Sequence, residues 1–295
     1  MYAPDKVLHR GVLYVVATPI GNLEDITLRA IRILREVQLI AAEDTRRTKK
    51  FLHAHEIHTP LTSLYDQIED KKSSFLISKL NEGMNVAYVS DAGTPGISDP
   101  GYVLIRQAIA NAIRVVPIPG VSAVIAALSV SGLPMNSFVF GGFLPSRPVK
   151  RRQFLMSMKN ETRTMVFYES PKRLMSTLHD VKEILGDREV VISRELTKVF
   201  EEILRGRVGE VISLLQDGVV KGEVTLLIAG KKKLLCSDDE IRVRFKQLQE
   251  NTGFTRRDII DTIAGEMGVS RKRVYREVIK AGDKLPIRQG SPVSG

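Results

Sequence analysis

Apolar and amphipathic segments alternate along the first 132 residues. Each apolar run is followed by a turn-rich loop and then by a segment with helical periodicity, as in Thr27–Arg35, Arg47–Leu52 and Ala123–Ser131. Repeated strand, loop and helix predicts a parallel sheet covered by helices on both faces. The predicted strands are Val12–Ala17, Leu39–Ala42, Val86–Ser90 and Val115–Ile118.

A second alternation begins at Phe138, after Gly132-Leu133-Pro134 interrupts the first. Its strand-like runs are Thr164–Tyr168, Val190–Ser193 and Val224–Ala229, with helical patterns at Lys172–Ile184 and Gly209–Leu215. The apolar runs stop near Gly230. The fold class is therefore α/β, and a length of 295 residues suits about two such domains. We predict α/β lobes over 1–132 and 133–232, a helical domain over 233–283 and a disordered tail over 284–295.

The segment from Asp238 onward predicts three helices. Thr255, with Asp258 three residues later, is typical of a helix start, and Gly268 of a helix end. Ser270 can begin a third helix, so that this pair resembles a helix-turn-helix. The third helix favours nucleic-acid contact over a bundle that only packs on the rest of the chain, because it carries many cations. These are Arg271, Lys272, Arg273, Arg276 and Lys280.

The charge and composition of the chain indicate which kinds of partner and site it can have. Residues 231–295 hold 15 Lys and Arg against nine Asp and Glu, a surplus of six in a chain of net charge +10. Such a balance favours anionic partners. A lone cysteine, Cys236, excludes an internal disulfide. His53, His55 and His58 form a weak metal candidate beside the alternative of a polar surface. No apolar stretch reaches 18 residues and no export signal precedes the first strand, so we expect a cytoplasmic protein without membrane contact.

Four loops follow the first four predicted strands, where ligands bind in open parallel sheets. The third loop has three glycines and two prolines in eleven residues, a composition that allows close backbone approach yet limits flexibility. Together with the three other loops, this loop favours a small-molecule binding site over the alternative of a tight strand-to-helix connection without a ligand. The chain lacks the dinucleotide, P-loop and hydrolase motifs G-x-G-x-x-G, G-x-x-x-x-G-K-[ST] and G-x-S-x-G. The loops are Thr18–Asn22, Glu43–Arg46, Asp91–Gly101 and Pro117–Ala123.

Seven motifs, in order, resemble the tetrapyrrole methylase superfamily, and within it the members that methylate ribosomal RNA. They are Leu13–Leu23, Ala42–Arg46, Val89–Gly101, Pro119–Ala123, Phe167–Pro171, Arg194–Lys198 and Lys221–Glu223. The resemblance covers about residues 11–230. It implies a homodimer, with S-adenosylmethionine bound between two α/β lobes. It also implies methylation of the 2′-hydroxyl of a cytidine in the decoding region of small-subunit (16S) ribosomal RNA.

One departure bears on the main alternative, a methyltransferase for a small tetrapyrrole. Relatives that modify tetrapyrroles carry Gly-Asp-Pro where this chain has Gly93-Thr94-Pro95. The missing acid and the basic C-terminal segment speak against that alternative. A third hypothesis, a nucleic-acid-binding module without catalysis, explains the basic segment but leaves the four loops unexplained.

The resemblance also assigns residues. The donor is expected to contact Pro19, Asp91, Ala92, Gly93, Thr94, Ile97, Ser122, Ala123, Tyr168, Glu223 and Thr225. Methyl transfer needs alignment and no metal, although a base or a cation would assist a weak hydroxyl nucleophile. Candidate bases are Asp44, Asp91 and Glu195, each of which could instead be a helix cap or an ion-pair partner, and Lys198 is a candidate cation. From the positions of the basic residues themselves, RNA contacts are expected from Arg46, Arg47, Lys49, Arg151, Arg271 and Arg273, with solvent-exposed helix faces as the alternative for the first four.

Overall fold

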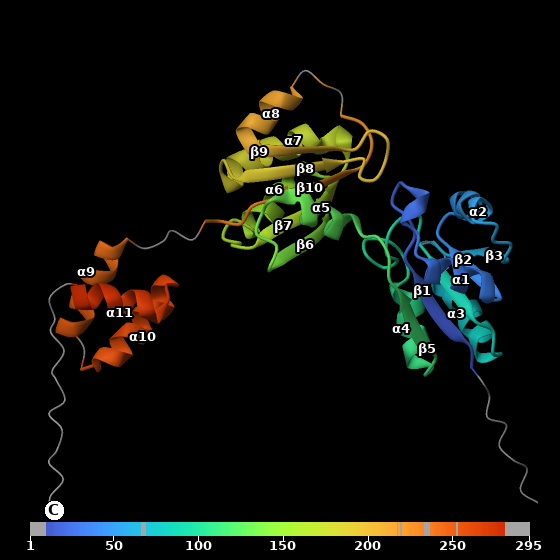
Figure 1. Cartoon of the computed structure of the whole chain (residues 1–295), viewed down its shortest axis with the longest axis horizontal. Helices are drawn as coiled ribbons and strands as arrows, with labels where there is room; N and C mark the ends of the chain where they lie inside the picture. The colour runs from blue at the N-terminus through green and yellow to red at the C-terminus, as the bar shows by residue number, and fades with distance from the viewer. Residues whose placement is uncertain are drawn as a thin grey trace, which may run out of the picture. The chain divides into compact units, whose positions relative to one another are not determined.

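The computed structural model describes residues 10–65, 69–216, 218, 220–232, 237–251 and 253–280 (Figure 1). Its internal contacts divide the chain into two compact units, residues 1–231 and 232–295. Unit 1 holds two five-stranded sheets with their helices, and unit 2 holds three helices. Cys236 and the predicted tail over 284–295 lie outside the described residues.

The first sheet is wholly parallel, as its strand–loop–helix pattern predicts. The strand order is β3-β2-β4-β1-β5, with every neighbouring pair parallel. Side chains from one face pack against α1 and α2, and those from the other face against α3 and α4, so both faces are buried. The strands are β1 (Val12–Val16), β2 (Leu39–Ala42), β3 (Leu61–Ser63), β4 (Val86–Val89) and β5 (Arg114–Ile118). The helices are η1 (Leu23–Asp25), α1 (Leu28–Glu36), α2 (Thr45–Ala54), α3 (Glu69–Asn81) and α4 (Tyr102–Ala110).

The second sheet is mixed, in the order β6-β7-β10-β8-β9, with only β6 and β7 parallel. One face packs on α6, α7 and α8, and the other packs on α5 (Ala123–Ser131), the helix that follows the first sheet. The strands are β6 (Phe138–Phe143), β7 (Thr164–Glu169), β8 (Glu189–Arg194), β9 (Glu202–Arg207) and β10 (Val224–Ile228). The helices are α6 (Pro148–Ser157), α7 (Pro171–Leu185) and α8 (Val208–Leu215).

Unit 2 consists of α9 (Asp238–Asn251), α10 (Arg256–Met267) and α11 (Arg271–Lys280) around an apolar core of its own. The three predicted helices are confirmed. The Thr255 hydroxyl accepts from the Asp258 amide at 3.3 Å, and Gly268 ends α10 with a φ of 62°. The Ser270 hydroxyl accepts from the Arg273 amide at 3.3 Å at the start of α11. Within the described part of the chain, we find no helix with the length and apolar character needed to cross a bilayer.

Candidate active site

A cavity of about 370 Å³ lies at the carboxyl edge of the first sheet, in the size range of small-molecule sites. Loops after β1, β4 and β5 form one side, and the second sheet forms the other. The first lobe contributes Ile20, Ala92, Gly93, Thr94, Ile97, Ser98, Asp99, Ser122 and Ala123. The second contributes Phe143, Tyr168, Glu169, Ser170, Pro171, Ser193, Leu196, Gly222, Glu223, Val224 and Thr225.

Backbone hydrogen bonds fix the loops that line this cavity. The amides of Thr18 and Gly93 each donate to the other residue's carbonyl, at 2.9 and 3.0 Å, and so join the loops after β1 and β4. Gly93 adopts a φ of +79°, a conformation that favours glycine. Ser98 adopts a φ of 70° without being glycine, and such strain often accompanies functional loops.

Three polar side chains lie in a row across the second sheet. Thr225 on β10 pairs with Tyr168 on β7 and with Ser193 on β8, and all three line the cavity. Burial raises the pKa of the Tyr168 phenol to about 12, and the charge of Asp99 adds to this effect, so the phenol stays neutral. Ser193 is 1% exposed, and its hydroxyl finds no hydrogen-bond partner in the part of the chain that the structure describes. Because a buried polar group without a partner is costly, Ser193 is suited to bind a polar ligand atom.

A second cavity, of about 220 Å³, adjoins the first and shares Ile20, Ala92 and Glu223 with it. Its walls carry more charge, from Arg47, Asp91 and Lys198. Nine of the eleven residues predicted to contact the donor line the first cavity. The other two, Pro19 and Asp91, line only the second.

Two of the candidate bases lie side by side at the start of α2. The Asp91 carboxylate accepts from the Asp44 amide at 3.0 Å and forms an ion pair with Arg47 at 3.1 Å. Asp44 is the N-cap of α2, accepting from the Arg46 amide at 2.8 Å. Hydrogen bonds from the side chain and then the backbone of Arg46 lower the pKa of Asp44 to about 2. Asp44 is therefore a weak base at neutral pH, whereas Asp91 faces a cavity.

Lys198 is held between two carboxylates. Its ammonium lies 2.8 Å from Glu195 Oε1 and 3.0 Å from Glu223 Oε2. Burial lowers the pKa of Lys198, but the hydrogen bonds to these carboxylates outweigh it and raise the pKa overall. The hydrogen bond from Lys198 in turn lowers the pKa of Glu195. Gly222 has a φ of +88°, and a Cβ there would lie 2.3 Å from Glu195, so the close packing requires glycine.

The residues predicted to bind RNA fall into three environments. Arg46 and Arg47 have side chains 88% and 69% exposed beside the second cavity, and Lys49 is exposed on the same helix. For Arg151 the prediction is wrong, because its side chain is 4% exposed and forms an ion pair with Asp180 at 2.7 Å. In unit 2, Arg271 is exposed and lies 2.5 Å from Asp261.

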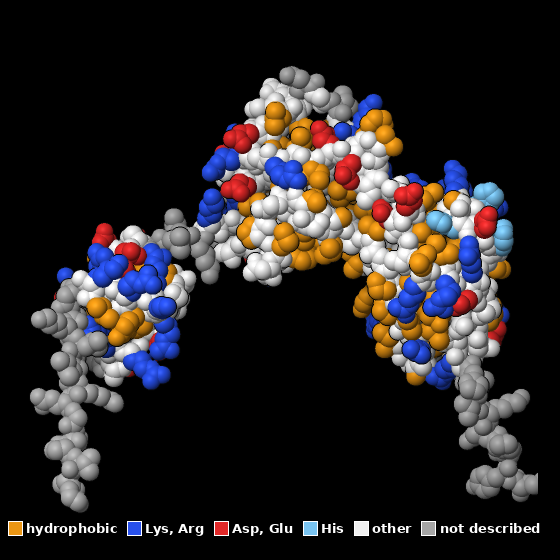
Figure 2. Space-filling model, viewed as in Figure 1, with side chains coloured by type: hydrophobic (Ala, Val, Ile, Leu, Met, Phe, Trp, Pro, Cys, Tyr) orange, Lys and Arg blue, Asp and Glu red, His pale blue; other side chains and the backbone are white. Residues whose placement is uncertain are grey.

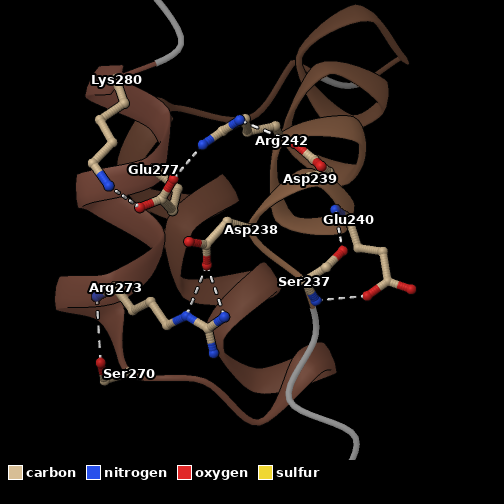
Figure 3. A network of polar contacts seen from close by, with 9 residues as sticks. All are labelled: Ser237, Asp238, Asp239, Glu240, Arg242, Ser270, Arg273, Glu277 and Lys280. Atoms are coloured by element: carbon tan, nitrogen blue, oxygen red, sulfur yellow. Dashed lines mark hydrogen bonds and ion pairs between the residues drawn. The ribbon is translucent and has the colours of Figure 1, made fainter.

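The sixth predicted RNA ligand, Arg273, belongs to a polar network that joins α9 to α11 (Figure 3). Its guanidinium lies 2.7 Å from Asp238 on α9, which ties it to the bundle. Buried Glu277 forms a second connection, 2.7 Å from Arg242 and 2.8 Å from Lys280. Among the described residues, no group of three or more His, Cys, Asp and Glu side chains is arranged to hold a metal ion.

A family model of tetrapyrrole (corrin/porphyrin) methylases matches residues 12–212 of this chain. The chain belongs to the tetrapyrrole methylase family. Solved structures related to this tetrapyrrole methylase show the same fold. Uroporphyrin-III-C-methyltransferase from Thermus thermophilus has a TM-score of 0.54 at 21% identity, over 75% of this chain and 94% of its own. Diphthine synthase has a TM-score of 0.56 at 14% identity, over 74% and 89%.

Curated relatives of this tetrapyrrole methylase are much more similar in sequence. Ribosomal RNA small subunit methyltransferase I of Halalkalibacterium halodurans is 45% identical over 271 residues, covering 90% of this chain and 94% of the relative. The protein of the same name from Thermotoga maritima is 50% identical over 222 residues, covering 75% of this chain and all of the relative.

The first cavity fits the methyl donor of the tetrapyrrole methylase family, S-adenosylmethionine. Apolar walls from Ile97, Phe143 and Leu196 suit the faces of an adenine ring. Small residues at Ala92, Gly93 and Ala123 allow the backbone to approach a ligand closely. The unpaired Ser193 hydroxyl supplies a polar contact. Sequence reasoning missed Phe143, Ser193 and Leu196; a serine ending the apolar run Val190–Ser193 was the available signal for one of them.

Proposed function

We propose that this protein transfers a methyl group from S-adenosylmethionine to the 2′-hydroxyl of a cytidine in the decoding region of 16S ribosomal RNA. The observation that carries the proposal is the pair of adjoining cavities, one suited to the donor and the other lined by Arg47, Asp91 and Lys198. Relatives at 40–50% identity named for small-subunit ribosomal RNA methylation support the choice of acceptor.

The second cavity offers the groups that a ribose acceptor needs. When bound, S-adenosylmethionine supplies a methyl group already activated by its sulfonium sulfur. The walls of the two cavities align the acceptor oxygen with that methyl, which is the main catalytic contribution. Asp91 accepts the proton of the ribose hydroxyl, because it lines the second cavity, whereas neither Asp44 nor Glu195 does, and because Asp44 is too weak a base.

Cations around the second cavity complete the acceptor site. The Lys198 ammonium stabilises negative charge that develops on the ribose oxygen. Arg46, Arg47 and Lys49 extend along α2 and contact RNA phosphates. The resemblance to ribosomal RNA methylases also predicts a homodimer that acts on assembled small subunits. These two predictions, and the cytoplasmic location expected from the sequence, are parts of this proposal.

A labelling experiment tests the proposal. Small subunits from cells that lack the methylation are incubated with the protein and S-adenosylmethionine labelled in its methyl group. The RNA is digested to nucleosides, and chromatography should find the label in 2′-O-methylcytidine. A parallel reaction with free 16S RNA shows whether the enzyme methylates the RNA alone or requires the assembled subunit. Label on a base, label in an added porphyrinoid instead of RNA, or no label at all would contradict the proposal.

A further inference from the structure

Unit 2 contains a cavity of about 420 Å³ that the proposed chemistry leaves without a role. It lies between the first turns of α10 and α11. Figure 2 shows Lys and Arg side chains gathered over this unit. The lining residues are Arg256, Arg257 and Ile260 from α10 and Arg271, Lys272 and Tyr275 from α11, and we refer to this surface as the α10–α11 groove.

The charge of the groove suits an anion. Four of its six lining residues are Lys or Arg. Within the described residues, neither Arg257 nor Lys272 forms a salt bridge, although both are exposed. Arg271 is held across the groove by Asp261 of α10. By contrast, Arg242, Arg244 and Arg273 on other faces of the unit bind carboxylates within the bundle.

The position of these cations is itself unusual. Arg256 and Arg257 are the first two residues of α10, and Arg271 and Lys272 are the first two of α11. Cations at helix N-termini oppose the helix dipole and weaken the helix, while anions are favoured there. Against these four cations the two first turns hold one acid, Asp258, so the charge balance is unfavourable for the bundle alone and an anionic partner would improve it.

An aromatic ring distinguishes the groove from a simple anion site. Tyr275 is 43% exposed, and Ile260 forms an apolar floor beneath the surface. An exposed ring flanked by cations is the arrangement that binds single-stranded nucleic acid, because bases stack on the ring while phosphates meet the cations. An acidic peptide would satisfy the cations and leave the ring without a partner.

We propose that the α10–α11 groove binds an unpaired RNA segment, with a base stacked on Tyr275 and phosphates on Arg257 and Lys272. The inference rests on the proposed function in that ribosomal RNA supplies such segments. RNA bound in the groove would add to the affinity from the phosphate contacts along α2 of unit 1. It would thereby slow the dissociation of the acceptor RNA from the enzyme.

Fluorescence anisotropy of the full-length protein with a short single-stranded RNA of mixed sequence tests the groove. Tyr275→Ala should weaken binding roughly 5- to 100-fold, as expected for the loss of one stacked base, and Tyr275→Phe should restore most of it. Arg257→Ala and Lys272→Ala should each reduce the slope of log K against log salt by about 0.7. Arg276→Ala removes the same charge from an exposed position of α11 outside the groove and should change affinity much less.

Two control measurements accompany the binding experiment, one of folding and one of methylation. Circular dichroism melting verifies that each variant remains folded. Wild-type affinity in Tyr275→Ala, or equal loss in Arg276→Ala and Arg257→Ala, would overturn the groove as an RNA site, as would competition by polyglutamate as strong as that by RNA. Ribose labelling of cytidine by the wild-type protein is measured separately, so that failure of the groove and failure of the proposed function give different results.

Discussion

At the scale of single residues, Ser193 is the side chain of the first cavity that we expect to bind the ligand rather than to stabilise the fold. Its buried hydroxyl lines the donor cavity without a partner in the described residues, so removing it should not lower the stability of the unliganded protein. Ser193→Ala should weaken S-adenosylmethionine binding about 5-fold, since one hydrogen bond contributes about 1 kcal/mol. Isothermal titration calorimetry measures the change.

Ser131 is the matched control for this experiment. It is equally buried, but its hydroxyl donates to the Leu128 carbonyl at 2.9 Å and accepts from the Leu133 amide at 3.1 Å. Ser131→Ala should therefore lower the unfolding temperature and leave donor affinity unchanged. Unchanged donor affinity in Ser193→Ala would show that the hydroxyl does not contact the donor.

Asp91 is the proposed base, and its neighbour Asp44 provides the comparison. Asp91→Asn keeps an acceptor for the Asp44 amide but cannot take up a proton, so the single-turnover rate constant of methyl transfer should fall roughly 100-fold or more. Asp44→Asn keeps a good N-cap for α2 and should retain most activity. Single-turnover methylation of small subunits measures both. Equal losses in the two variants would indicate a structural role for Asp91.

At the scale of elements, the buried pair between Arg151 of α6 and Asp180 of α7 tests the corrected role of Arg151. Asp180→Ala would leave a buried guanidinium poorly compensated and should cost about 3–5 kcal/mol of unfolding free energy. Arg151→Met should cost much less, because Asp180 keeps its ion pair with Arg152 at 2.8 Å and no buried charge is left without a partner. Urea unfolding measures both. If Arg151→Met were stable but bound RNA more weakly, the prediction that Arg151 contacts RNA would be correct after all.

The ion pairs of Glu277 between α9 and α11 predict a pH dependence for unit 2 (Figure 3). Hydrogen bonds from Lys280 and then Arg242 lower the pKa of this carboxyl below its usual range. A lowered pKa stabilises the fold above the unfolded-state value, near 4.3, and that contribution is lost as the pH falls toward the folded value. The protection factors of the α11 amides, which correct for the pH dependence of intrinsic exchange, should therefore fall on acidification below pH ~4.3.

Variants separate this effect from general acid sensitivity. Glu277→Gln cannot titrate, so the protection factors of its α11 amides should be lower than in wild type at neutral pH and should change less as the pH falls. Glu250→Gln, at an exposed position of α9, should behave like wild type. Equal pH dependence in wild type and Glu277→Gln would exclude Glu277 as the source.

The sequence predicted those elements whose pattern reflects burial. β1, β2 and β4 were found because nearly all their side chains are buried or half-buried in continuous apolar runs. β3 and β9 were not predicted. Both lie at sheet edges with partly exposed side chains, and β9 is the polar run Glu202–Arg207. Periodicity reports burial, so edge strands are the elements it detects least well.

The same reasoning explains which site residues were found. Loops after the parallel strands were predictable because parallel strands end at one edge, and nine of the eleven expected donor contacts line the first cavity. Ser193 and Phe143 were missed because their approach to that cavity depends on the strand order of a mixed sheet, which local pattern does not encode. Arg151 was misassigned because its partner, Asp180, is 29 residues away.

At the scale of the whole molecule, the first and second cavities, which we propose to bind donor and acceptor, both belong to unit 1. The Thermotoga maritima relative matches 75% of this chain over its entire length, and unit 1 alone is long enough to supply that match. The family model likewise ends at residue 212. The chemistry should therefore reside in unit 1, with unit 2 adding RNA affinity.

A chain ending at Lys231 separates the two contributions. It should bind S-adenosylmethionine with the Kd of the full chain, because every residue lining the donor cavity remains. Its kcat at saturating acceptor should be preserved, whereas its KM for small subunits should rise and depend less steeply on salt, since the phosphate contacts of the α10–α11 groove are gone. Calorimetry and initial rates at several salt concentrations measure these quantities. A normal KM with a lowered kcat would instead mean that unit 2 acts on the chemical step, and the division of roles between the units would be wrong.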